Sequence, residues 1–194
     1  MSKAERTREF IIQRTAPIFN KKGYAGTSLS DMTDATGLTK GSIYGNFADK
    51  DEVALAAFAF NTSTVSAILR NEIAKRASYR DKLMVYVEVY GNMGQVPYLE
   101  GGCPILNTIT EADDTHPQLK ARAVEALMGW KDRLTALVDE GVKAGEFKAN
   151  TDPEEVAVTM ISLLEGIVLF VKATGKASYR KHIVNSLTRL IKAL

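Results

Sequence analysis

Polar side chains that could contact a nucleic acid gather near the start of a short helix between residues 27 and 50. Thr39 can cap this helix, and Lys40 lies in its first turn. Lysine and the free N–H groups at a helix N-terminus can bind a phosphate, and lysine can also bind a guanine edge. The hydroxyl of Ser42 can meet a base or a phosphate, and that of Tyr44 can meet a phosphate oxygen. These residue types at this spacing therefore favour contact with nucleic acid.

Two short helices joined by a glycine turn are expected to position these side chains. Ser28 stands three residues before Asp31, which is the spacing of a capping box at a helix start. Gly37 ends that helix, because glycine adopts the left-handed conformation without a Cβ clash. The next helix has apolar or aromatic residues at Ile43, Tyr44 and Phe47. Two helices joined by a short turn with glycine form a helix-turn-helix, whose second helix enters the DNA major groove.

Helical periodicity continues through the rest of the chain, and no strand pattern competes with it. Gly23 ends a first helix, and the strongest helix start is Asp152-Pro153, a cap followed by proline at the first position. Further helices are expected over 49–75, 80–95, 105–114, 117–144, 153–174 and 178–193. The predicted fold class is all-α with about nine helices. A three-helix DNA-binding domain is expected over 1–48 and a larger helical domain over 49–194.

Charge is distributed unevenly along the 194 residues, although the net charge is only +2. The first 25 residues carry six basic and two acidic side chains, a net +4. The positive end of the chain therefore coincides with the predicted DNA-binding unit, as binding to phosphates requires.

The single cysteine, Cys103, excludes a disulfide or a cysteine-based zinc site within one chain. Its simplest role is that of a small buried or loop residue, because no basic cluster lies nearby to activate it. The start of the chain lacks the apolar segment of a secretory signal, so a cytoplasmic location is expected. The most apolar run, 156–171, is shorter than a bilayer span and contains Glu165. We interpret it as a buried helix and expect no membrane contact.

Aromatic, methionine and polar residues of the larger domain are candidates to line a ligand cavity, although core packing is the more common role of such residues. Glu165 interrupts an apolar run, so it needs a partner, either a cationic ligand or a polar group across a dimer interface. The candidates are Tyr86, Tyr90, Met93, Asn107, Thr110, Glu111, Trp130, Met160, Glu165 and Phe170.

Enzymatic chemistry has little support in the sequence. His116 and His182 are the only histidines, and neither has a second ligand at metal-binding spacing. No nucleophile elbow, phosphate loop or dinucleotide fingerprint is present. We expect no catalytic residues, no metal and no cofactor, and an enzyme on a helical scaffold is the weakest alternative. The stronger alternative to a DNA-binding regulator is a helical dimeric binding module without operator specificity.

The basic first helix, followed by T-S-L-S-D-M, G-L-T-K-G-S-I-Y-G-N-F and D-K-D-E, resembles the TetR family of bacterial transcriptional regulators over roughly residues 5–55. The stretch G-G-C-P-I-L-N-T-I-T-E-A-D-D-T-H-P resembles a segment of some members. The resemblance implies a homodimer, paired through the last two long helices, that binds a double-stranded DNA operator. It further implies a repressor that a small-molecule effector releases, so that residues 49–194 form the effector-binding and dimerisation domain.

The resemblance also implies individual contacts. Lys40, Gly41, Ser42 and Tyr44 match the DNA-contacting helix, Thr27 and Ser28 match backbone-contacting positions, and Lys50 matches one at the next helix; Thr39 caps the contacting helix. Gly45 and Asn46 depart from the pattern, since members often carry a histidine or a second aromatic residue there. Gly45 weakens the helix by about 1 kcal/mol relative to alanine. Asn46 could read adenine with its amide, so the operator sequence is not predicted.

Overall fold

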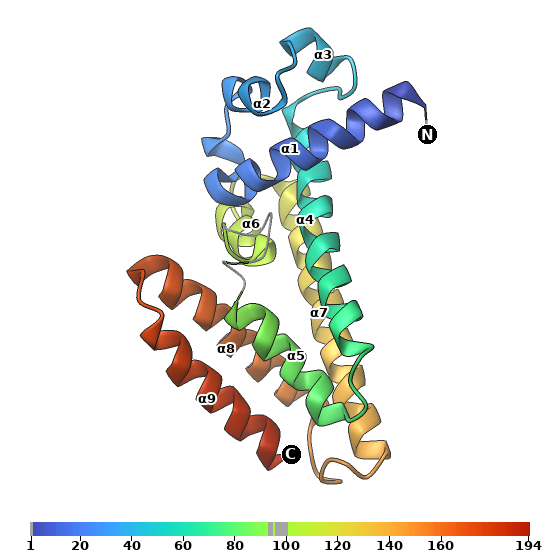
Figure 1. Cartoon of the computed structure of the whole chain (residues 1–194), viewed down its shortest axis with the longest axis vertical. Coiled ribbons are helices and arrows are strands. Elements are labelled where there is room, and N and C mark those ends of the chain that lie inside the picture. Colours follow the sequence, from blue (N-terminus) through green and yellow to red (C-terminus); the bar gives the residue numbers. More distant parts are fainter. Residues whose placement is uncertain (1, 93–94, 96–100) are drawn as a thin grey trace. The chain divides into compact units, whose positions relative to one another are not determined.

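The computed structural model describes residues 2–92, 95 and 101–194, and its regular elements over these residues are all helices. They are α1 (Lys3–Gly26), α2 (Leu29–Thr36), α3 (Lys40–Tyr44), α4 (Lys50–Ile73), α5 (Tyr79–Gly91), α6 (Pro104–Ala112), α7 (Pro117–Lys143), α8 (Pro153–Thr174) and α9 (Ser178–Ala193) (Figure 1). The all-α prediction is confirmed, and the predicted helix ends differ from the observed ones by a few residues.

The helices form two compact units, each with its own core. Unit 1 takes residues 1–64 and 94–124, and unit 2 takes residues 65–93 and 125–194. Both α4 and α7 contribute one half to each unit. Packing therefore groups α6 with the helix-turn-helix, whereas the predicted boundary between residues 48 and 49 separates them. The predicted boundary between the DNA-binding domain and the effector-binding domain stays a prediction.

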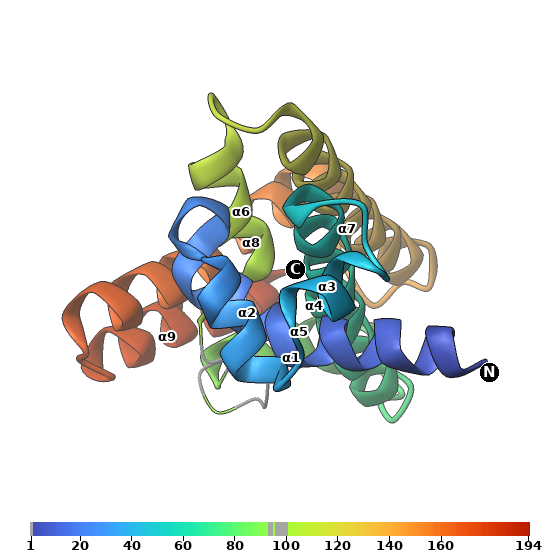
Figure 2. The same ribbon diagram turned by 90° about the horizontal axis from the view of Figure 1, so that it is seen from above.

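The core of unit 1 is built from one face of each short helix. Ile11 and Phe19 of α1, Met32 of α2, and Ile43 of α3 with Phe47 after it are almost completely buried. Both α2 and α6 pack against α1, and Figure 2 shows α1 and α2 beside each other. Because α2 and α3 are short and cannot bury much apolar surface with α1 alone, α6 and the first half of α4 complete this core.

A break inside α1 sets the path of the chain into α2. Gly23 has φ 74° and ψ 179°, a conformation that glycine adopts almost exclusively. The chain resumes a helical turn at Tyr24, and the carboxylate of Glu111 on α6 accepts hydrogen bonds from the backbone N–H groups of Tyr24 (2.8 Å) and Ala25 (2.9 Å). The prediction that Gly23 ends the regular first helix is confirmed in this sense.

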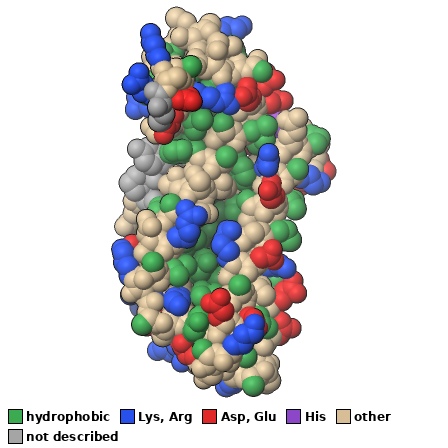
Figure 3. Space-filling view, turned by 90° about the vertical axis from the view of Figure 1, so that its right-hand side faces the viewer, with side chains coloured by type: hydrophobic (Ala, Val, Ile, Leu, Met, Phe, Trp, Pro, Cys, Tyr) green, Lys and Arg blue, Asp and Glu red, His purple; other side chains and the backbone are tan. Residues whose placement is uncertain are grey.

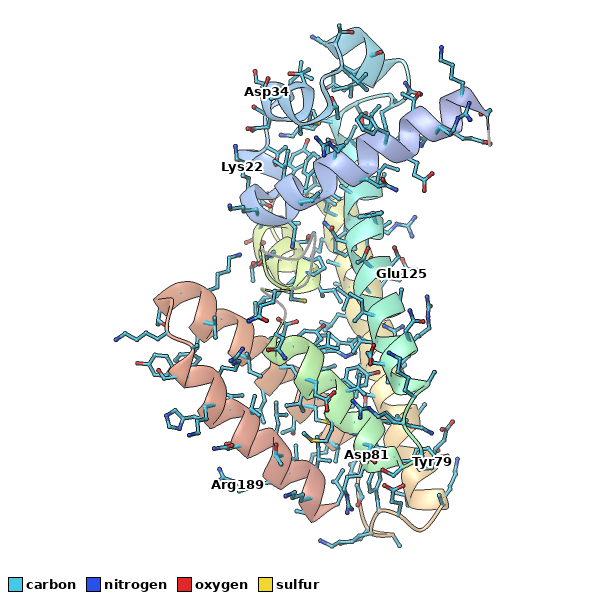
Figure 4. The ribbon with its side chains drawn as sticks, in the orientation of Figure 1. Lys22, Asp34, Tyr79, Asp81, Glu125 and Arg189 are labelled. Carbon is cyan, nitrogen blue, oxygen red and sulfur yellow. The ribbon has the colours of Figure 1, made fainter. Side chains whose placement is uncertain are left out.

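Unit 2 is a bundle in which α5, α8 and α9 pack against one another, joined by the second half of α7. The indole of Trp130 on α7 stacks on the ring of Tyr90 on α5, with centroids 4.8 Å apart. The carboxylate of Glu146 accepts hydrogen bonds from the first two N–H groups of α5, at Tyr79 (2.8 Å) and Arg80 (2.7 Å). Figure 4 labels Tyr79 and Asp81 at this end of α5.

Helix α8 has one buried face and one exposed face. Met160 and Leu164 are completely buried, whereas Val158 and Leu169 are 50% and 58% exposed. The predicted buried helix is therefore buried on one face only, and large apolar side chains on its other face remain exposed. Both α4 and α8 are long and apolar enough to cross a bilayer, but one or two such helices are weak evidence for a membrane protein.

Candidate nucleic-acid interface

The helix-turn-helix is formed by the local signals that predict it. Ser28 accepts a hydrogen bond from the N–H of Asp31 (3.1 Å), and Asp31 accepts one from the N–H of Ser28 (2.8 Å), a complete capping box. Gly37 ends α2 in the left-handed conformation, with φ 67°. The hydroxyl of Thr39 accepts a hydrogen bond from the N–H of Ser42 (3.2 Å) and so starts α3.

The first turn of α3 is exposed while its other side is anchored in the core. Thr39, Lys40, Gly41 and Ser42 are all exposed, as is Ser28 at the start of α2. On the opposite side of α3, Ile43 is completely buried. A helix N-terminus held rigidly in this way presents N–H groups, a lysine and a hydroxyl to solvent together, and this is the arrangement that a phosphate or base edge requires.

The remaining predicted contacts on this surface are half-buried. The side-chain amide of Asn46 donates to the carbonyl of Ser42 (2.8 Å), so reading adenine with both amide groups requires this bond to be exchanged. The ammonium of Lys50 lies 4.4 Å from the centre of the Tyr24 ring. Tyr44 is half-buried beside them. The DNA contacts of these three residues stay predictions, and both Asn46 and Lys50 already make contacts within this unit.

Thr27 does not belong to the exposed set, in contrast to the prediction. Its side chain is completely buried, and its hydroxyl donates to the carbonyl of Gly23 (2.6 Å). The hydrogen bond closes the turn after the α1 break, so Thr27 fixes the entry into α2. Its side chain cannot reach DNA without leaving this buried position.

Arg8 on α1 is a residue of this unit that the sequence analysis missed. Its guanidinium donates to the carbonyl of Asn46 and to the carboxylate of Glu52, and it lies 4.0 Å from the centre of the Phe47 ring. Glu52 in turn accepts a hydrogen bond from the N–H of Ala48 (2.7 Å). Arg8 therefore fixes the turn that follows α3. Its partners lie 38 and 44 residues away in sequence, so no local pattern reveals it.

Two titratable side chains near the helix-turn-helix have pKa values shifted by their hydrogen-bond partners. The Lys22 ammonium and the Ser28 groups hydrogen-bond to Asp31 and lower the pKa of its carboxyl to about 2. Lys22 projects from the end of α1, close to α2 (Figure 4). The Asp51 carboxylate accepts a hydrogen bond from the Tyr24 hydroxyl and, with burial, raises the pKa of Tyr24 to about 12. Both groups keep their usual charge at neutral pH.

Two of the predicted ligand residues on α6 bind α1 instead of standing free. The amide of Asn107 donates to the carbonyl and to the side-chain oxygen of Asn20, both at 3.0 Å. Glu111 caps the turn after Gly23. Thr110 is exposed on the same helix. A hollow in unit 1 is lined in part by Asn107 and Glu111, and a ligand role for either stays a prediction that must coexist with these bonds.

The other predicted ligand residues fall in unit 2, so the structure does not bring the candidates together in one unit. Tyr86, Tyr90 and Trp130 are almost completely buried, and burial raises the pKa of the Tyr86 hydroxyl. The indole N–H of Trp130 is buried without a hydrogen-bond partner among the described residues. Met160 is core, Glu165 is half-buried, Phe170 is exposed against Tyr179, and Met93 lies outside the described residues.

Comparison with known proteins shows that two family models match successive parts of this chain. "Bacterial regulatory proteins, tetR family" matches residues 11–57, and "Tetracyclin repressor-like, C-terminal domain" matches residues 80–187. The chain belongs to the TetR family. Members of this family are helix-turn-helix transcriptional regulators that typically act as ligand-responsive repressors, and they are not generally enzymes. The exposed first turn of α3 lies within residues 11–57, which match the DNA-binding model of the family, and its contacts with DNA stay a prediction.

Solved structures of the family share the whole fold. A TetR-family regulator from Cytophaga hutchinsonii is 44% identical, with a TM-score of 0.92 over 100% of this chain and 97% of that one. Another, from Chloroflexus aurantiacus J-10-FL, is 35% identical, with a TM-score of 0.93 over 99% and 97%. Among curated relatives, the transcriptional repressor DhaR from a Mycobacterium species is 24% identical over 170 residues, covering 85% of this chain and 82% of DhaR.

Proposed function

We propose that this TetR-family regulator represses transcription by binding a palindromic operator as a homodimer, and that a small-molecule effector releases it. The observation that carries the proposal is the exposed N-terminus of α3, anchored by the buried Ile43. A single five-residue helix contacts few base pairs. Two copies related by a two-fold axis double the contacts and demand a palindrome with half-sites about 35 Å apart.

The exposed apolar side chains of unit 2 support dimerisation through α8 and α9. Val158 and Leu169 on α8, with Phe170 nearby, are roughly half exposed, and Tyr179 on α9 is 38% exposed. Large apolar side chains that remain this exposed and lie close together are typical of a subunit interface. Such a dimer works at DNA in the cytoplasm, where we place this protein, and it makes no use of a membrane. Figure 3 shows another face, where basic, acidic and apolar side chains are mixed without a large field of one sign.

The chemistry inside unit 2 supports an effector that carries a hydrogen-bond acceptor. The indole N–H of Trp130 is a buried donor that has no hydrogen-bond partner among the described residues, and a buried polar group of this kind costs stability until it is satisfied. Tyr86 on α5 contributes a second buried polar group, its hydroxyl. An effector with an aromatic or apolar body and an acceptor atom would therefore stabilise unit 2, and the effector-bound state would have the lower operator affinity.

Band shifts on the DNA upstream of this protein's own gene test the proposal. We expect one palindromic site to bind at least about 1,000-fold more tightly than random DNA. Lys40→Ala should weaken binding and reduce the slope of log affinity against log salt by about 1. Lys143→Ala, which lies in unit 2 and pairs with Asp139, is the matched control. Equal affinity for all DNA, or a Lys40 variant that binds like the control, would contradict the proposal.

A further inference from the structure

The outermost line of side chains on α8 has a spacing that reads the same in both directions. It consists of Glu155, Val158, Ser162, Glu165, Leu169 and Lys172, at steps of 3, 4, 3, 4 and 3 residues. All are exposed except Glu165, which is half-buried. Alternating steps of three and four place these residues along one seam of a helix, as in a coiled coil. The opposite line, which includes Met160 and Leu164, is the buried face.

The chemistry of this seam is also complementary to itself when it is reversed. An acid stands at one end and a base at the other, and each is followed inward by a large apolar residue. When two copies of α8 lie antiparallel across a two-fold axis, Glu155 faces the partner's Lys172 and Val158 faces the partner's Leu169. The small Ser162 then faces the partner's Glu165, next to the axis. A two-fold interface requires this kind of self-complementarity.

The parallel arrangement lacks this match. It would place Glu155 against the partner's Glu155 and Lys172 against the partner's Lys172, so like charges would meet at both ends of the seam. The helix dipoles would also point the same way. The antiparallel arrangement instead brings the first-turn acid of one helix beside the last-turn base of the other, where each charge also suits its own dipole end. Charge therefore selects one of the two directions.

We infer that two copies of this chain pair through α8 in this antiparallel register, with two Glu155–Lys172 ion pairs at the ends of the seam. The inference rests on the dimer proposed above, and it names the register and the residues that set it. The two positions next to the axis hold Ser162 and Glu165, and the small side chain of Ser162 leaves room for the partner's Glu165. The exposed side chains of Val158 and Leu169 cover each other across the interface, and this contact occurs once on each side of the two-fold axis.

Charge reversal gives a direct test. The Glu155→Lys homodimer would place lysine against lysine twice, and the Lys172→Glu homodimer would place glutamate against glutamate twice. We expect each variant alone to dimerise about tenfold more weakly than wild type at low salt. When the two variants are mixed, every facing pair becomes one lysine and one glutamate, so the heterodimer should regain wild-type affinity. Sedimentation velocity measures the association, and a tag on one variant identifies the heterodimer.

The controls separate the register from the dimer itself. The double variant carrying both substitutions restores both pairs with reversed sign, so it should dimerise like wild type. Lys176→Glu is the off-register control, because it lies beyond the end of α8, and mixing it with Glu155→Lys should give no recovery. Wild-type dimers combined with no recovery in the Glu155→Lys and Lys172→Glu mixture would overturn the register alone. A wild-type chain that stays monomeric at micromolar concentration would overturn the proposed dimer as well.

Discussion

Replacing Gly23 with alanine should destabilise unit 1 through two separate effects. At φ 74° and ψ 179° any Cβ strains the backbone, by about 1–3 kcal/mol for this region of conformational space. A Cβ at this position would also stand 2.3 Å from a carboxylate oxygen of Glu111, which is far inside van der Waals contact. The carboxylate must then move away and release the N–H groups of Tyr24 and Ala25.

The second effect is smaller because Glu111 is only half-buried, so water can reach the N–H groups that it releases. Two hydrogen bonds at about 0.5 kcal/mol each give a loss of about 1 kcal/mol. Gly23→Ala should therefore lower the free energy of unfolding of unit 1 by about 2–4 kcal/mol. Glu111→Ala alone should lower it by about 1 kcal/mol, and in that background Gly23→Ala should cost only the backbone strain. The double variant is then less destabilised than the sum of the single ones by about 1 kcal/mol.

Urea unfolding followed by far-UV circular dichroism, at one fixed protein concentration, measures these differences. Trp130 fluorescence reports on unit 2 and should change little. Gly26→Ala is the matched control, since a Cβ there meets only the Cβ of Lys22 at an ordinary 3.5 Å. If Gly23→Ala behaves like Gly26→Ala, the strain is absent. If its cost is the same with and without Glu111, the carboxylate does not cap the turn.

Two other perturbations test contacts around the recognition helix. Arg8→Lys keeps the charge but cannot hold the carbonyl of Asn46 and the carboxylate of Glu52 together. We therefore expect operator binding about fivefold weaker than wild type in a band shift. Arg6→Lys is the control, and an equal loss of binding in that variant would contradict this reasoning. The raised pKa of Tyr24 contributes stability that is complete below pH 10 and is lost as pH rises through about 12. Asp51→Asn should return the Tyr24 pKa toward 10, seen as earlier phenolate absorbance, and an unchanged titration would exclude Asp51 as the cause.

The helix-turn-helix could be predicted because its signals are local. The capping box at Ser28, the left-handed Gly37 and the cap at Thr39 each act within four residues. Their side chains decide where helices begin and end before any tertiary contact forms. For the same reason the exposed first turn of α3 could be assigned from the sequence, since a capped start followed by Ile43 in the core leaves the opposite face in solvent.

The supports of this unit could not be predicted, because they join residues distant in sequence. Glu111 contacts α1 across 86 and 87 residues, and Arg8 reaches Asn46 and Glu52 across 38 and 44. An exposed glutamate or arginine has many equivalent partners until the helices pack. Thr27 shows the converse error: a threonine beside a cap resembles a phosphate contact, but the turn at Gly23 directs it into the core.

Helix α8 shows why hydrophobicity alone misplaced a buried surface. An apolar run indicates that its side chains are buried away from water, but it does not indicate whether they pack against their own chain or against a second one. The two cases differ in periodicity, because a helix buried within one chain needs a single apolar face, and α8 has two. Its second face includes Glu155 and Lys172 at the ends, and a purely intrachain core would have no use for charges there. In the proposed antiparallel pairing these charges meet across the dimer axis, and hydropathy alone carries no such information about assembly.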